Sequence, residues 1–160
     1  MSKNEYWSHE TCIIETQNIG SNTKIWAFSH ISKNVKIGKN CTIGERVYIG
    51  PGVVIGDNVK VQNNSLIYEG VTIEDEVFIG PNVVTTNDIE PRATGSWKDR
   101  FRETKFEKGC SIGANSTIIC GNKIGSNSLV GAGSVVTKNV EPDTVVVGNP
   151  ARFLRRNKCQ

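Results

Sequence analysis

The sequence predicts an all-β protein built from a six-residue repeat. Isoleucine and valine together account for 34 of the 160 residues, against three leucines and five alanines. Side chains that branch at Cβ lose rotamer freedom in a helix and fit the pleated surface of a sheet, so this balance argues against a helical bundle. Isoleucine or valine recurs at every sixth position along most of the chain, and the series is interrupted once. These observations predict a single domain over residues 1–160.

The first block of repeats runs from Ile13 to Val84. Twelve positions spaced six apart carry isoleucine or valine: Ile13, Ile19, Ile25, Ile31, Ile37, Ile43, Ile49, Ile55, Val61, Ile67, Ile73 and Ile79. The residue four places later is small or β-branched in every repeat but the one with Gln17, and glycine often follows the isoleucine directly. Residues i and i+4 of a strand point to the same side, so both series are predicted to face inward. We expect the glycine at i+1 to let the chain turn a corner.

The repeat stops after Val84 and returns in a new phase at Phe106. Ile79 and Phe106 lie 27 residues apart, which is not a multiple of six, so residues 85–105 are predicted to form an inserted loop. The second block continues at six-residue spacing with Phe106, Ile112, Ile118, Ile124, Val130 and Val136. Residues 141–160 are predicted to form a C-terminal cap and tail.

Three repeats make one triangular coil of 18 residues, so the 18 repeats predict about six coils. At a strand spacing of ~4.8 Å this stack is roughly 29 Å long. Each coil would pair its backbone with the coils above and below, so only the two ends would expose sheet edges.

Charge and cysteine content exclude several classes of protein. A net charge of +3 fits no strong polyanion binder, so no nucleic-acid partner is expected. No apolar run approaches the ~18 residues of a membrane span, and residues 1–10 contain no signal-peptide core. The five cysteines form no CxxC pair or Cys/His cluster, which predicts reduced thiols in a cytoplasmic protein and no metal site.

The repeat resembles the left-handed parallel β-helix of the hexapeptide-repeat acyltransferases. The resemblance covers about residues 13–152, and it implies the left-handedness, which the spacing alone does not determine. It also implies a homotrimer with active sites between subunits and acetyl-CoA as the co-substrate. A flat-faced prism can also bury one face against two copies of itself in a closed ring, which independently favours the trimer.

Four segments of the second block resemble the coenzyme A-binding coils and exit segment of these enzymes: residues 112–117, 130–134, 136–138 and 147–152. Carried over by position, Ala114 and Ala132 would present backbone groups to the pantetheine amides. Thr137, Lys138 and Arg152 would meet the adenosine phosphates. The last ten residues contain four basic side chains and no acid, and guanidinium groups suit phosphate oxygens. On charge alone, a solvated basic tail that caps the open coil is the alternative.

The inserted loop resembles that of bacterial nucleotide-sugar 3-N-acetyltransferases, which act on UDP-2-acetamido-3-amino-2,3-dideoxy-glucuronate or dTDP-3-amino sugars. The similarity extends to residues 25–31, 61–64, 86–87 and 91–92. It implies that Asn87 lies beside the sugar amine, where its side-chain carbonyl would accept a hydrogen bond and orient the nitrogen lone pair. An asparagine that bonds its own turn is the alternative.

Further substrate contacts are predicted for Gln62, Asn63, Asn64, Tyr68 and Arg92. The amides would bind a sugar or nucleotide, or would stack as structural ladders within the helix. Arg92 would pair with a hexuronate carboxylate or a diphosphate, or would anchor the loop.

Histidine is the commonest general base, yet the chain has only His9 and His30 and the loop has neither. Beside Trp26 and Phe28, His30 is a candidate for an aromatic subunit contact, a catalytic base or a substrate contact. An amine that is already neutral carries its own lone pair and needs positioning more than proton removal. The missing loop histidine therefore favours an amino-sugar acceptor over an alcohol.

The sequence thus predicts an acetyl-CoA-dependent N-acetyltransferase that acts on the 3-amino group of a nucleotide-linked sugar for surface polysaccharide synthesis. A UDP-3-amino hexuronate is the first choice of acceptor and a dTDP-3-amino deoxysugar the second. One alternative is an O-acetyltransferase that uses His30 as its base, and another is a non-catalytic β-helix used for assembly. A zinc γ-type carbonic anhydrase needs three histidine ligands, which this chain lacks.

Overall fold

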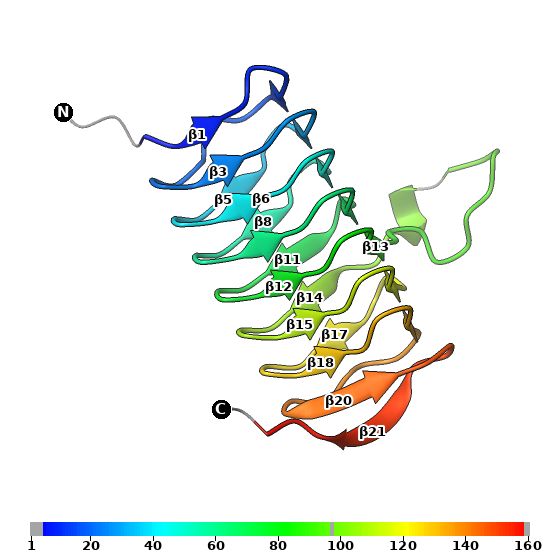
Figure 1. Cartoon of the computed structure of the whole chain (residues 1–160). Helices are drawn as coiled ribbons and strands as arrows, with labels where there is room; N and C mark the ends of the chain where they lie inside the picture. Colours follow the sequence, from blue (N-terminus) through cyan, green and yellow to red (C-terminus); the bar gives the residue numbers. More distant parts are fainter. Residues whose placement is uncertain (1–4, 97, 159–160) are drawn as a thin grey trace.

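The computed structural model describes residues 5–96 and 98–158, and its strands form three sheets (Figure 1). The first sheet contains, in order, β1 (Trp7–Ser8), β3 (Lys24–Ile25), β6 (Thr42–Ile43), β9 (Lys60–Val61), β12 (Phe78–Ile79), β15 (Ser111–Ile112), β18 (Leu129–Val130), β20 (Thr144–Val147) and β21 (Arg152–Arg156). The second contains β2 (Ile13–Ile14), β4 (His30–Ile31), β7 (Tyr48–Ile49), β10 (Leu66–Ile67), β13 (Val84–Thr85), β16 (Thr117–Ile118) and β19 (Val135–Val136). The third contains β5 (Lys36–Ile37), β8 (Val54–Ile55), β11 (Val71–Ile73), β14 (Thr104–Phe106) and β17 (Lys123–Ile124).

Successive strands of the chain enter successive sheets, and each coil pairs in parallel with the next. Ile25 pairs with Ile43, and Ile31 pairs with Ile49, which is the 18-residue step predicted for a triangular coil. The result is a left-handed parallel β-helix, visible as the stacked coils of Figure 1. The predicted fold is therefore confirmed.

The core is the single column of side chains that the repeat predicts. Isoleucines such as Ile25, Ile43 and Ile49 are fully buried, and so are fourth-place residues such as Val35 and Val53. Both series face the centre of the prism, because alternate residues of a strand share one side.

The stack is longer than the sequence predicts. The first sheet contains nine strands, of which only β21 runs antiparallel, so eight parallel layers lie along this face. The count of about six coils was low because β1 and β20 add layers at the two ends without carrying the repeated isoleucine.

In the first repeat, the inward-facing residue lies one position later than the sequence pattern predicts. Ile14 pairs with Ile31 on the inner side, whereas Ile13 pairs with His30 and is 58% exposed. The prediction that Ile13 faces the core is therefore wrong, because a one-residue shift along a strand moves a side chain to the opposite face.

The corner glycines have a different role from the one predicted. The residues with positive φ lie at i+3, where asparagines such as Asn22 and Asn58 adopt φ near 60°. Asparagine tolerates this left-handed conformation better than most residues. Glycine at i+1 is required by close approach instead, since a Cβ on Gly113 would lie 2.4 Å from the Ala132 nitrogen of the next coil.

The inserted loop is shorter than residues 85–105. Thr85 and Thr104 are buried in β13 and β14, so the segment outside the stack is 86–103. Thr85 lies six residues after Ile79 and continues the inward series with a β-branched side chain in place of isoleucine. A 3-10 helix, η1 (Lys98–Arg100), lies within this segment, and Trp97 lies outside the described residues.

The C-terminal segment covers the last coil. Strand β21 runs antiparallel to β20 and ends the first sheet. The turn between them covers the end of the second sheet at β19. There the Ala151 N–H donates to the Val135 carbonyl, and the Val135 N–H donates to the Gly148 carbonyl. These bonds satisfy backbone groups that an open sheet edge would leave exposed.

Four cysteines, Cys12, Cys41, Cys110 and Cys120, are free thiols, and Cys159 lies outside the described residues. Burial raises the pKa of the Cys110 thiol to about 12 and also raises the pKa of Cys41. Both thiols therefore stay protonated and unreactive near neutral pH. In the part of the chain described, no helix has the length and apolarity needed to cross a membrane.

Candidate active site

Two edges of the triangular prism contain most of the predicted site residues. The segments that link the second sheet to the third form what we call the loop edge: residues 32–34, 50–52, 68–70, 86–103, 119–121 and 137–139. The segments that link the first sheet to the second form the amide edge: residues 26–28, 44–46, 62–64, 80–82, 113–115 and 131–133. The inserted loop leaves the stack from the loop edge, as the projecting segment of Figure 1 shows.

Threonine hydroxyls fasten the loop to the coils on either side. Thr85 Oγ1 accepts the Tyr68 N–H at 2.9 Å, and Thr86 Oγ1 accepts the Cys120 N–H at 2.9 Å. On the returning arm, Thr104 Oγ1 accepts the Gly121 N–H at 3.2 Å. The sequence interpretation missed these threonines, although their position at the break in the repeat was a usable signal.

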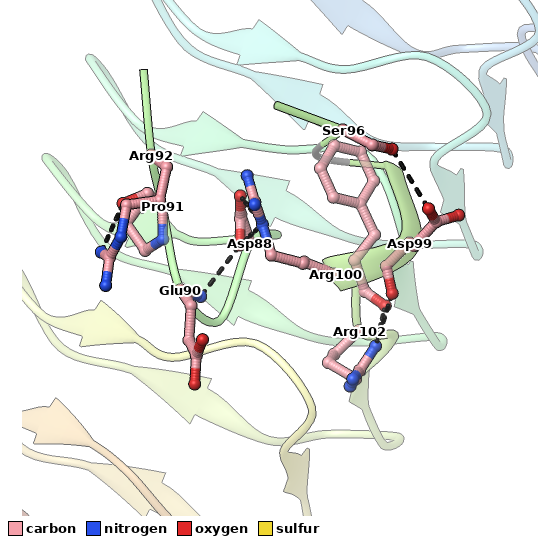
Figure 2. Close-up of polar contacts among 9 residues, drawn as sticks. Asp88, Glu90, Pro91, Arg92, Ser96, Asp99, Arg100 and Arg102 are labelled. Atoms are coloured by element: carbon pink, nitrogen blue, oxygen red, sulfur yellow. Dashed lines mark hydrogen bonds and ion pairs between the residues drawn. The ribbon is translucent and has the colours of Figure 1, made fainter. Parts of the chain in front are cut away.

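Asn87 is the first loop residue beyond these attachments. It is half-buried, and its backbone carbonyl accepts a hydrogen bond from the backbone N–H of Arg102, on the returning arm of the loop, at 3.0 Å. Arg92 lies further out, is exposed, and donates from Nη1 to the Pro91 carbonyl at 2.9 Å (Figure 2). The two predicted residues of the loop therefore differ in position: Asn87 lies at the base of the loop, and Arg92 lies on its exposed outer part.

Four predicted residues lie along the loop edge, at several levels of the stack: Tyr68, Asn87, Thr137 and Lys138. Tyr68 lies 18 residues before Thr86, one coil above the start of the loop, and Thr137 and Lys138 follow β19, two strands below β13. Lys138 and Arg152 both line a cavity of about 260 Å³ under the last coil, together with Glu141. Two of the three residues predicted to bind the phosphates, Lys138 and Arg152, thus lie at the same cavity, and Thr137 is outside its lining.

Five further predicted residues lie on the amide edge: Gln62, Asn63, Asn64, Ala114 and Ala132. Asn63 Oδ1 accepts the Glu45 N–H at 3.0 Å, and Asn64 adopts φ 61° at the corner. Asn63 thus bonds the backbone of the preceding coil and Asn64 forms its own corner, while their contact with a substrate stays a prediction. Ala132 also lines a surface hollow of about 380 Å³, formed with Phe78 and Gly113.

His30 lies away from the loop. Its Nε2 is 3.1 Å from Glu15 Oε2, and its ring meets Tyr48 edge-on with centroids 5.6 Å apart. In the second sheet β4 is three strands from β13, a separation of ~14 Å along the stack. Tyr48 in turn lies 5.5 Å from Tyr68, so the aromatic rings form a row up this face.

The aromatic neighbours predicted for His30 are engaged elsewhere. Trp26 packs against Trp7 with centroids 5.3 Å apart, and the Arg46 guanidinium lies 5.7 Å from the Phe28 ring. The sequence interpretation missed Tyr48, although it lies 18 residues, or one coil, after His30. His9, which had no predicted role, bonds the Thr11 hydroxyl. Within residues 5–96 and 98–158, no three metal-ligating side chains gather.

Models of two repeat families match the chain. "Bacterial transferase hexapeptide (six repeats)" matches residues 18–51 and 52–87, and "Hexapeptide repeat of succinyl-transferase" matches residues 104–138. Among curated proteins, the chain is 50% identical over 152 residues to dTDP-3-amino-3,6-dideoxy-alpha-D-galactopyranose 3-N-acetyltransferase of Aneurinibacillus thermoaerophilus. That alignment covers 95% of this chain and 78% of the relative.

Two solved structures share the fold. A variant of GDP-perosamine N-acetyl transferase from Caulobacter crescentus, in complex with CoA and GDP-perosamine, is 19% identical with a TM-score of 0.72, over 82% of this chain and 56% of that chain. A variant of AntD, an N-acyltransferase from Bacillus cereus in complex with dTDP-4-amino-4,6-dideoxyglucose and Coenzyme A, is 21% identical with a TM-score of 0.65, over 95% of this chain and 81% of that chain.

Proposed function

This chain belongs to the bacterial hexapeptide-repeat transferases, and we propose that it acetylates the 3-amino group of a nucleotide-linked sugar with acetyl-CoA as the acetyl donor. The observation that carries the proposal is the 50% identity, over 95% of the chain, to an enzyme named as a 3-N-acetyltransferase of a dTDP-linked amino sugar. The same relative favours a dTDP-3-amino-3,6-dideoxyhexose as acceptor over the UDP-3-amino hexuronate that the sequence ranked first. The product would serve surface polysaccharide synthesis.

The arrangement of the loop edge supports this activity. Asn87 lies at the level of β13, and Lys138 follows β19, two strands or ~10 Å further along the stack. Acetyl-CoA bound along this edge, with its phosphates at Lys138 and Arg152, would carry its thioester toward the loop. The acceptor sugar would then approach from the other side, next to Tyr68.

We include the homotrimer in the proposal because one chain does not bring its two candidate edges together. A three-fold rotation about an axis along the stack would bring the loop edge of one copy against the amide edge of the next. Each of the three clefts would then combine Asn87 with the backbone groups of Ala114 and Ala132 from a neighbour. Light scattering should give a trimer, and a fully active monomer at working concentration would refute this arrangement.

The reaction needs orientation more than a protein base. The Asn87 side-chain carbonyl would accept a hydrogen bond from the neutral amine and direct its lone pair at the thioester carbon. The C–N bond forms, the C–S bond breaks, and the departing thiolate takes the proton released by the nitrogen. An amine with a pKa of ~8 has an appreciable neutral fraction at physiological pH.

Replacing Asn87 with alanine should lower kcat only several-fold, because one positioning hydrogen bond is worth ~1 kcal/mol. Steady-state assays with a saturating dTDP-3-amino sugar would measure this. A loss on the order of 10⁴-fold would instead require a direct proton-transfer role at this position.

His30→Asn tests the competing O-acetyltransferase mechanism. Rotation about an axis along the stack keeps His30 ~14 Å from the level of Asn87, so we expect kcat to stay near the parent value. If His30 is the base, its loss should cost ~10²–10⁴-fold and remove the acidic limb of the pH–rate profile. Such a collapse in a folded trimer would favour the O-acetyltransferase.

The function itself is tested with a panel of dTDP- and UDP-linked amino sugars and acetyl-CoA, with release of free CoA thiol as the readout. Mass analysis should find an amide at C3 of the product, whereas an ester would indicate O-acetylation. A protein that neither releases thiol nor gains thermal stability with CoA would be a non-catalytic assembly protein.

A further inference from the structure

The base of the inserted loop is closed by contacts between its two arms. Asp88 and Phe101 form an antiparallel bridge, and Arg102 N–H donates to the Asn87 carbonyl at 3.0 Å. Arg100 Nε lies 3.2 Å from Oδ1 and 3.1 Å from Oδ2 of Asp88 (Figure 2). Asp88 Oδ1 also accepts the Glu90 N–H at 2.9 Å, so one carboxylate holds both its own arm and the returning arm.

This ion pair lies in an unusual place. The side chains of Arg100 and Asp88 are only 23% and 12% exposed, whereas residues 90–96 around them are exposed. Removing two charges from water costs about as much as their attraction returns, so such a pair adds little to net stability. Its value lies in geometry, since the Arg100 Nε N–H is shared between both carboxylate oxygens of Asp88 and so ties the returning arm to the outgoing one.

Asn87 is fixed from three directions. The preceding residue, Thr86, is bonded to the stack through the Cys120 N–H. Its own carbonyl is bonded to Arg102, and the following residue, Asp88, is held by Arg100. The Asn87 backbone is therefore the link between a segment fastened to the rigid stack and a segment fastened by the ion pair.

We propose that Arg100 is a positioning residue for acetyl transfer, which clamps Asp88 so that Asn87 points its side chain at the reacting amine. The inference rests on the proposed function, because it assigns Asn87 to the acceptor. Arg100 acts through Asp88 and the Asn87 backbone and does not itself take part in bond making. Its Nη2 is buried and has no hydrogen-bond partner among the described residues, so Asp88 alone does not satisfy the guanidinium. A lysine at this position keeps the charge but carries it on a flexible stem without a planar group.

Two measurements on the full chain test the clamp. Hydrogen exchange of the Arg102 amide, followed by mass spectrometry, should be on the order of tenfold faster in Arg100→Ala, while amides of the stack keep their protection. The kcat for the amino sugar should fall several-fold, by no more than in Asn87→Ala, with KM for acetyl-CoA unchanged. Arg100→Lys should recover part of the loss. Ser96→Ala is the matched control, because it removes only an exposed hydrogen bond to Asp99 in the same loop.

A double variant separates positioning from general damage. In an Asn87→Ala background, Arg100→Ala should lower kcat by less than about twofold further, because the residue that it positions is already absent. The proposal would be overturned if the kcat losses of the two single variants multiply in the double variant. It would also be overturned if Arg100→Ala keeps both the parental exchange rate of the Arg102 amide and the parental kcat. If the parent acetylates no amino sugar, the proposed function fails, and the exchange of the Arg102 amide alone decides whether Arg100 holds the Asn87 segment.

Discussion

Replacing Ile49 with alanine should lower the free energy of unfolding by ~2–5 kcal/mol. Ile49 is fully buried in β7 and stacks between Ile31 and Ile67 in the central column. The coils above and below are held at a constant spacing by backbone hydrogen bonds, so they cannot collapse into the space left by the lost side chain. The cost should therefore include the cavity as well as the lost burial.

Urea unfolding monitored at one fixed protein concentration measures this effect, because assembly contributes to apparent stability. Lys39→Ala is the control, since Lys39 is exposed at a corner of the same stack. Its stability should stay within about 0.5 kcal/mol of the parent. Equal losses in the two variants would mean that the inward-facing register is wrong.

A Lys138→Ala, Arg152→Ala double variant should raise KM for acetyl-CoA by at least about tenfold. Hydrogen bonds between charged groups are worth ~1.5–3 kcal/mol each, and both side chains line the same cavity. The value of kcat should change little, because these groups would bind the remote nucleotide equally in the ground and transition states.

Two comparisons sharpen this test. Arg155 lies in β21 together with Arg152, but it does not line the cavity. Arg155→Ala should therefore leave KM for acetyl-CoA near the parent value. Acetyl-dephospho-CoA should be a poorer acetyl donor than acetyl-CoA for the parent protein, and the difference between the two donors should be smaller in the double variant. An unchanged KM in the double variant would move the coenzyme site elsewhere on the molecule.

The repeat made most of the fold predictable, because a six-residue period is a local pattern that places side chains such as Ile25 and Val35 inward without knowledge of distant contacts. The same pattern could not decide between Ile13 and Ile14, since both are isoleucine and only pairing with β4 selects one. The role of glycine at i+1 was also hidden, because the steric restriction on Gly113 comes from Ala132 in the next coil.

For the candidate site, the sequence by itself determined the residue types and their order: an asparagine at the start of an inserted loop, a basic C-terminal segment and no histidine between them. Only the tertiary structure decided that Asn87 shares an edge with Lys138, and that His30 lies three strands away. It alone joined Asp88 to Arg100, because residues 86–103 have no repeat from which a contact could be read. Periodic segments take their geometry from the stack, whereas this loop takes its shape from individual polar contacts between residues far apart in the sequence.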